Sequence, residues 1–144
     1  MKLLEAIRSN SIFGHQIIQD NSSYFKAVFN IDKDGSSIVF SAETNKTDSM
    51  SRKIWEIYLT RKDKDFREHS DIPIDGKIFS TIENILIRFL EIKHPKVFQF
   101  STKENSIEKL IPALIPEIES YGGYLFKQEV LPNKTKIYKF EKIK

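Results

Sequence analysis

The residues with the most evident capacity for chemistry lie in a dense run of charges between 62 and 70. Side chains that can ligate a metal ion occur at four positions in and just after this run: Asp65, Glu68, His69 and Asp71. A zinc site usually draws on more than one histidine or cysteine to complete its tetrahedral shell, and no second histidine lies nearby. The run is therefore predicted to be a solvated loop, with a metal site as the disfavoured alternative.

Other groups that could do chemistry are scattered along the chain. His15 stands alone and is predicted to be an incidental surface or half-buried histidine. Cysteine is absent, which excludes disulfides, thiolate metal sites and a cysteine nucleophile. Serines and carboxylates occur without a strained nucleophile turn, and no Gly-x-x-x-x-Gly-Lys phosphate loop is present. No catalytic residue is predicted, and a metal is not expected.

Composition bounds the class of protein. The 144 residues are 40% hydrophobic and 30% charged, which predicts one soluble globular domain spanning 1–144. Eleven Phe and five Tyr indicate an aromatic, sheet-rich core. Glu5 and Arg8 interrupt any apolar signal segment, and no apolar run is long enough to span a bilayer. A cytoplasmic protein without membrane contact is expected.

The charge balance disfavours nucleic acid as a partner. The net charge is +3, and the 23 basic residues are interleaved with 20 acidic ones instead of gathering on one face. The single basic cluster is formed by Lys134, Lys136, Lys139, Lys142 and Lys144. These lysines are predicted to guard a solvated edge strand against pairing with another sheet.

The first half of the chain predicts an antiparallel meander. Apolar residues alternate from Tyr24 to Ile31 and again from Ile38 to Ala42, and Gly35 lies in the turn between them. The polar segment 43–52 is predicted to be a loop, and Ile54 to Arg61 a third strand. Residues 13–18 are predicted to form a first strand or a loop, and Lys2 to Arg8 a short helix.

The second half supplies the helices. Asp75 is the expected cap of a helix from Gly76 to Lys93, followed by a strand from Val97 to Phe100. A second helix is expected from about Asn105 to Tyr121, kinked or split because Pro112 and Pro116 lie inside it. Two further strands close the chain, 124–130 and 136–143. The core is expected to include Phe79, Ile82, Phe89, Val97 and Phe100.

The predicted fold class is α+β: a single domain with a mixed, mostly antiparallel sheet. Its order of a three-strand meander, helix, strand, helix and two strands resembles the acetyl-CoA-dependent N-acetyltransferase fold over residues 24–143. The strand ending at Phe100 leads through Ser101-Thr102-Lys103-Glu104 into Asn105-Ser106-Ile107, and the last helix ends in Tyr121-Gly122-Gly123, as in that fold. More narrowly, residues 75–82 and 95–101 look like segments of small uncharacterised bacteriophage proteins.

The resemblance to acetyltransferases does not extend to their cofactor loop. Those enzymes hold the pyrophosphate of coenzyme A on backbone N–H groups of a glycine-rich loop at a helix start. The corresponding stretch here is 71–77, where Gly76 is the only glycine, Pro73 lacks a donor and Asp75 brings a negative charge. The prediction is that no cofactor binds. If acetyl-CoA does bind, the resemblance implies that Gly76 and Lys77 contact it.

These observations favour a non-catalytic binding or assembly protein on an acetyltransferase-like scaffold. The resemblance to phage proteins implies a viral protein that either belongs to the virion or binds a host factor, located in the host cytoplasm or the virion. The alternative is an acyl-CoA-dependent N-acyltransferase with a divergent cofactor loop. A protein partner or homo-oligomer is expected, and the hypothesised interface consists of apolar residues of the proline-containing helix and a closing strand: Leu114, Ile115, Ile118, Tyr121 and Tyr138.

Overall fold

The computed structural model describes residues 12–31, 35–69, 72–73, 75–102 and 105–143. The expected helix at residues 2–8 lies outside these ranges. The elements follow in the order β1 (His15–Asp20), β2 (Tyr24–Asn30), β3 (Ser37–Thr47), β4 (Lys53–Lys62), β5 (Glu68–His69), α2 (Gly76–Lys93), β6 (Val97–Thr102), α3 (Asn105–Tyr121), β7 (Tyr124–Val130) and β8 (Lys136–Lys142).

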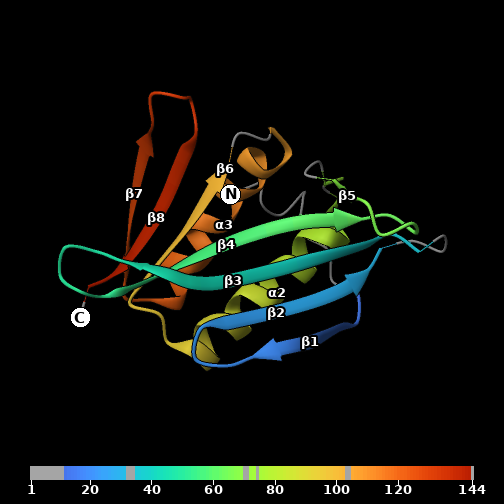
Figure 1. Ribbon diagram of the computed structural model, residues 1–144, viewed down its shortest axis with the longest axis horizontal. Helices are drawn as coiled ribbons and strands as arrows, with labels where there is room; N and C mark the ends of the chain where they lie inside the picture. The colour runs from blue at the N-terminus through green and yellow to red at the C-terminus, as the bar shows by residue number, and fades with distance from the viewer. Residues whose placement is uncertain (1–11, 32–34, 70–71, 74, 103–104, 144) are drawn as a thin grey trace.

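The strands form one mixed, mostly antiparallel sheet, as predicted. Its order is β1-β2-β3-β4-β6-β8-β7, and the short β5 pairs with the end of β4 (Figure 1). Within the described residues β4 and β6 are the one parallel pair. They pair from Ile54 and Val97 as far as Ile57 and Phe100, after which β4 continues beside β5 at Arg61 and Lys62. The confirmed fold class is therefore α+β.

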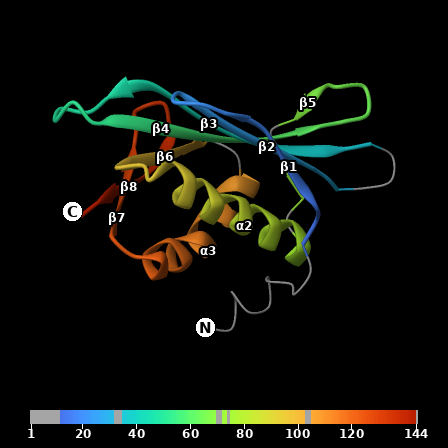
Figure 2. The same ribbon diagram turned by 90° about the horizontal axis from the view of Figure 1, so that it is seen from below.

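Both helices cover the same face of the sheet, which Figure 2 shows from the side. A wide apolar stripe on α2 faces the inward residues of β2, β3 and β4, because a helix lying on a sheet must bury one whole side. Phe89 is at the centre of this layer. The five residues predicted for the core, including Phe89, are all at most 2% exposed. The opposite face of the sheet carries no described helix (Figure 2).

Helix α2 begins and ends where the sequence predicts. Asp75 caps it by accepting a hydrogen bond of 2.8 Å from the Ile78 N–H. At the other end His94 adopts the left-handed conformation with φ 47°, and its N–H donates to the Leu90 carbonyl. Pro95 follows and prevents the helix from continuing.

The second helix was predicted to be kinked or split at Pro112 and Pro116, and the split is wrong. One helix, α3, runs through both positions from Asn105 to Tyr121. Each proline leaves the carbonyl four residues earlier without its helical donor. Both prolines are exposed, so water can reach that side of the helix and compensate.

Two expectations about strands are also corrected. Residues 43–47 were predicted as part of a loop but extend β3. Only residues 48–52 are left for the turn between β3 and β4. Asp48 Oδ1 stabilises this turn by accepting hydrogen bonds from the N–H groups of Met50 and Arg52, each at 2.9 Å. The lysine-rich strand β8 is not at an edge but between β6 and β7. Residues 15–20 are a strand, β1.

Candidate functional site

The helix-free face of the sheet carries a row of polar side chains. Strand residues alternate between the two faces, so cross-strand partners lie side by side on one of them. The register aligns six residues of six adjacent strands in one line: Tyr24, Glu43, Glu56, Gln99, Lys139 and Lys127. The acidic members of this row belong to β3 and β4, whereas the basic members belong to β8 and β7.

Two polar side chains at the centre of this row are buried. Glu56 is 6% exposed and its neighbour Gln99 is 7% exposed. Glu56 also lies directly opposite Glu43 in the antiparallel pair of β3 and β4, an arrangement of like charges that destabilises a sheet. A buried carboxylate opposite another carboxylate is not what packing alone would select, so we place the candidate site here.

Lys46 and Tyr58 compensate the charge of Glu56. Tyr58 donates a hydrogen bond of 2.5 Å to Glu56 Oε2, and Lys46 Nζ lies 2.9 Å from Oε1. Glu56 Oε1 is buried and accepts no hydrogen bond. Its contact with Lys46 is therefore an ion pair only. Burial alone would raise the pKa of the Glu56 carboxyl, but Tyr58 and Lys46 outweigh it and hold that pKa below its ordinary value.

The same contact changes the acidity of the tyrosine. Burial, the hydrogen bond to Glu56 and the nearby charge of Glu43 raise the pKa of the Tyr58 phenol. A general acid or base works best when its pKa is near the working pH, because both protonation states must be accessible. Glu56 and Tyr58 are shifted in opposite directions away from neutrality, so the pair is suited to holding a fixed hydrogen bond and not to transferring a proton.

A hollow of about 510 Å³ adjoins this pair on the helix-free face. It lies over β2, β3 and β4, and its polar lining includes Tyr24, Lys26, Glu43, Tyr58, Thr60 and Glu68. This lining contains two carboxylates, two phenol rings and one lysine. Carboxylates and aromatic faces both attract cations, so this lining favours a positively charged group or a hydrogen-bond donor.

A second hollow, of about 530 Å³, lies at the end of the molecule where α2 finishes. It is rich in cations, among them Arg52 and Lys93. Both are already paired: Arg52 lies 2.7 Å from Asp48 and 3.3 Å from Glu141, and Lys93 contacts Asp20. The carbonyl end of α2 also points toward this region and attracts cations itself. The positions of Arg52 and Lys93 are thus explained without a bound anion.

The start of α2, where the resemblance implies Gly76 and Lys77 as cofactor contacts, is closed by the chain itself. The Asp75 carboxylate occupies the capping position, and Lys77 Nζ lies 4.3 Å from the centroid of the Phe13 ring. The Phe13 N–H donates to Thr81 Oγ1 at 2.8 Å, which fixes this segment over the first turn. A carboxylate at the helix start and an aromatic ring over its lysine do not fit a pyrophosphate.

Within the charged run that was predicted to be a loop, residues 63–67 form the turn between β4 and β5, whereas Glu68 and His69 belong to the strand β5. His69 Nε2 lies 2.9 Å from Asp63 Oδ2, and the pKa of the Asp63 carboxyl is lowered by this contact and by the Arg67 N–H. Asp71 lies outside the described residues. In the part of the chain that the structure describes, no group of three or more His, Asp or Glu side chains is placed to hold a metal ion.

The residues of the hypothesised interface separate into two groups. Leu114 and Ile118 are fully buried and Tyr138 is 5% exposed, so these three pack inside a single chain. Ile115 is half-buried, and Tyr121 is 37% exposed. Only the last two are accessible to a partner, on the outer side of α3.

Sequence reasoning missed Glu43, Glu56 and Tyr58. The signal for two of them was present, since Glu56 and Tyr58 alternate with apolar residues in the predicted third strand and therefore share its other face. Glu43 was missed because residues 43–52 were predicted to be a loop, in which no sheet face can be assigned.

A comparison with protein-family models and with curated proteins found no match to this chain. None of the described helices is both long and apolar enough to cross a membrane.

Proposed function

We propose that this protein is a non-catalytic binding protein and that its helix-free sheet face receives a basic side chain of a protein partner. The observation that carries this proposal is the hollow beside the buried Glu56 and its exposed hydrogen-bond partner Tyr58, in which Glu43 and Glu68 outnumber Lys26. Tyrosine-rich, partly desolvated hollows are typical centres of protein interfaces, because a rigid ring supplies contact area at little entropic cost.

Two features support a role without catalysis. The pKa values of Glu56 and Tyr58 lie away from neutrality, which makes the pair a poor proton-transfer couple. The start of α2 is occupied by Asp75 and by the contact between Phe13 and Lys77. Because of the resemblance to small bacteriophage proteins, we propose that the partner is a host factor or a component of the virus particle.

The proposal is tested by a titration of isotopically labelled protein followed by NMR. A lysine-rich peptide should shift the backbone amides of Tyr24, Glu43 and Tyr58, whereas a glutamate-rich peptide of equal length should not. Glu43→Gln should weaken the response, and Glu119→Gln, an exposed position on α3, is the matched control. Equal shifts with both peptides, or shifts confined to another face, would refute the assignment.

The alternative is an acyl-CoA-dependent N-acyltransferase on an acetyltransferase-like scaffold. What supports it is the parallel pair of β4 and β6, which stops pairing after Ile57 and Phe100 next to a carboxylate and a phenol. Calorimetry with acetyl-CoA separates the two proposals. The binding protein should give no heat, and a micromolar dissociation constant that Lys77→Ala abolishes would establish the enzyme instead.

A further inference from the structure

Strand β7 leaves one side of its backbone unpaired at the end of the sheet. It is the last strand in the order of the described sheet, and no described element lies beyond it in that plane (Figure 1). The opposite edge, β1, is interrupted by an irregularity between Ile17 and Gln19. By contrast, β7 pairs with β8 over seven consecutive residues without a shift, and it contains no proline. A regular edge without a bulge or a proline is a template for another strand.

The direction of the unpaired groups follows from the two ends of the β7–β8 pair. The Ile143 N–H donates to the Gly123 carbonyl at 2.7 Å, and the Leu131 N–H donates to the Thr135 carbonyl at 2.8 Å. Residues that bond to the neighbouring strand alternate with residues that do not. The odd-numbered residues of β7 thus bond to β8. The N–H and C=O groups of the even-numbered residues point away from the sheet: Tyr124, Phe126, Gln128 and Val130.

We propose that two copies of this chain join β7 to β7 as antiparallel strands, with the two-fold axis passing beside Gln128. In this register the Gln128 residues of the two copies exchange hydrogen bonds through their outward-pointing groups. Lys127 then lies opposite Glu129 of the second copy, and the reverse pair is generated by the symmetry. On the other face Phe126 lies opposite Val130. The two sheets become one continuous sheet, and this interface is independent of the hollow on β2–β4.

Charge selects this register over its neighbours. A two-fold axis beside Lys127 places that lysine opposite its own copy, and an axis beside Glu129 places two glutamates together. Like charges directly opposite each other destabilise a strand pair, whereas opposite charges stabilise it. The axis beside Gln128 is flanked by two such favourable pairs. It also places apolar against apolar side chains at Phe126 and Val130.

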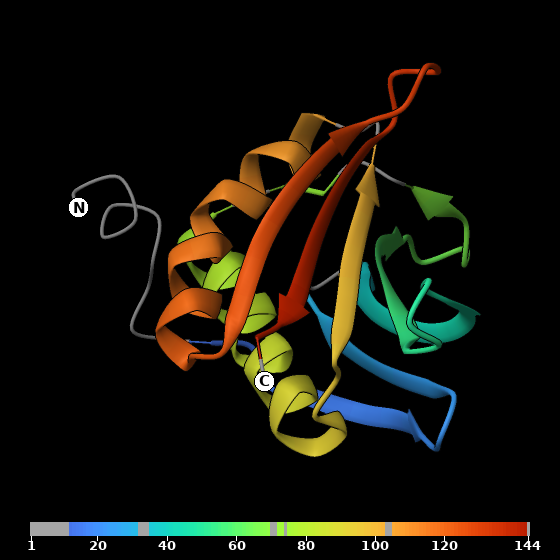
Figure 3. The same ribbon diagram turned by 90° about the vertical axis from the view of Figure 1, so that its left-hand side faces the viewer.

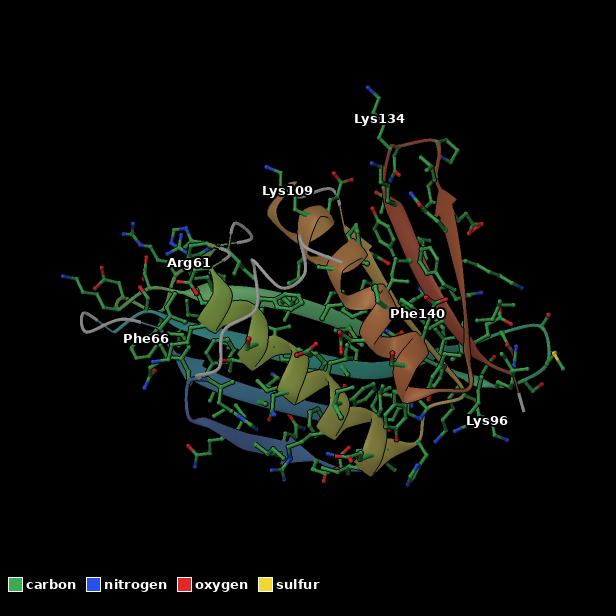
Figure 4. All side chains as sticks on the ribbon, turned by 180° about the vertical axis from the view of Figure 1, so that it is seen from behind. Arg61, Phe66, Lys96, Lys109, Lys134 and Phe140 are labelled. Atoms are coloured by element: carbon green, nitrogen blue, oxygen red, sulfur yellow. The ribbon has the colours of Figure 1, made fainter. Side chains whose placement is uncertain are left out.

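The exposed surface of β7 is consistent with a strand that gains a neighbour. Leu125 is 52% exposed and Val130 is 58% exposed, and Lys127 keeps 57% of its side-chain surface accessible while lying 3.3 Å from Glu141. The β7–β8 hairpin extends past the end of β6, as Figure 3 shows, with Lys134 at its tip (Figure 4). A second strand can therefore approach β7 along its full length.

Sedimentation of the full chain across the micromolar range tests the proposal. The wild type should shift from 16.9 kDa to twice that mass as concentration rises. Lys127→Glu and Glu129→Lys should each weaken self-association by about tenfold or more, because both symmetric contacts become like-charge pairs. An equimolar mixture of the two variants should recover the dimer. In the mixed dimer the carboxylate introduced at position 127 of one chain meets the ammonium introduced at position 129 of the other, and the unaltered Glu129 and Lys127 form the second pair.

The mixture is the decisive arm, because neither variant alone distinguishes a lost contact from a damaged hairpin. Gln128→Pro is the second probe: the N–H that it removes points outward and makes no hydrogen bond to β8, and proline is tolerated at such edge positions, so a folded monomer is expected, with folding checked by circular dichroism. A wild type that stays at 16.9 kDa throughout overturns the proposal. A Gln128→Pro variant that still dimerises overturns the edge contact, and a mixture that stays monomeric overturns the register.

Discussion

Phe89→Ala should be among the most damaging single changes in this protein. The Phe89 side chain is fully buried, and its ring centroid lies 5.4 to 6.2 Å from four other aromatic rings: Phe25, Phe40, Trp55 and Phe98. Truncating a buried phenylalanine costs about 3–5 kcal/mol through lost transfer energy and the cavity left behind. Because aromatic pairs contribute roughly 0.5–1.5 kcal/mol each beyond burial, the upper end of that range is expected here.

Urea denaturation measures the effect. With a slope of about 2 kcal/mol per molar urea, a loss of about 3–5 kcal/mol lowers the midpoint by about 1.5–2.5 M. Ile92→Ala is the matched control: it shortens another apolar side chain of α2, one that is 39% exposed, and should shift the midpoint little. A Phe89→Ala midpoint within error of the wild type would remove Phe89 from the centre of the core and refute the packing described for α2.

Three further predictions concern polar and backbone features. The pKa of the Glu56 carboxyl in the folded protein is below its ordinary value of 4.5, so ionised Glu56 stabilises the fold at pH values above 4.5. This stabilisation is lost as the pH falls through the folded-state pKa. Glu56→Gln should therefore make the unfolding free energy depend less on pH in the acidic range. His94→Gly should stabilise the protein by about 0.5–1 kcal/mol, because glycine adopts the left-handed conformation without a Cβ penalty, and a lowered melting temperature would contradict this. Asp75→Ala should cost about 1 kcal/mol in urea denaturation, whereas Asp75→Asn should retain most of the cap.

The strongest sequence signals were local ones. The bounds of α2 followed from the Asp75 cap and Pro95, and its buried face followed from an apolar stripe that includes Phe79 and Phe89. Each of these depends on residues within one or two turns of one another. The predicted possibility of a split at Pro112 and Pro116 failed, because the cost of a proline in a helix depends on whether the orphaned carbonyl can reach water, which sequence does not encode locally.

The sequence by itself determined where most strands and both helices lie, because periodicity and capping are properties of short segments. The tertiary structure decided what those segments present to a partner. Glu43, Glu56 and Gln99 are far apart in the chain, and only the register of β3, β4 and β6 aligns them on one face. Likewise β8, whose lysines suggested an edge, lies inside the sheet, and β7 takes the edge. Strand order and register are set by packing between distant segments, so the candidate site and the exposed edge arise only when the whole sheet has formed.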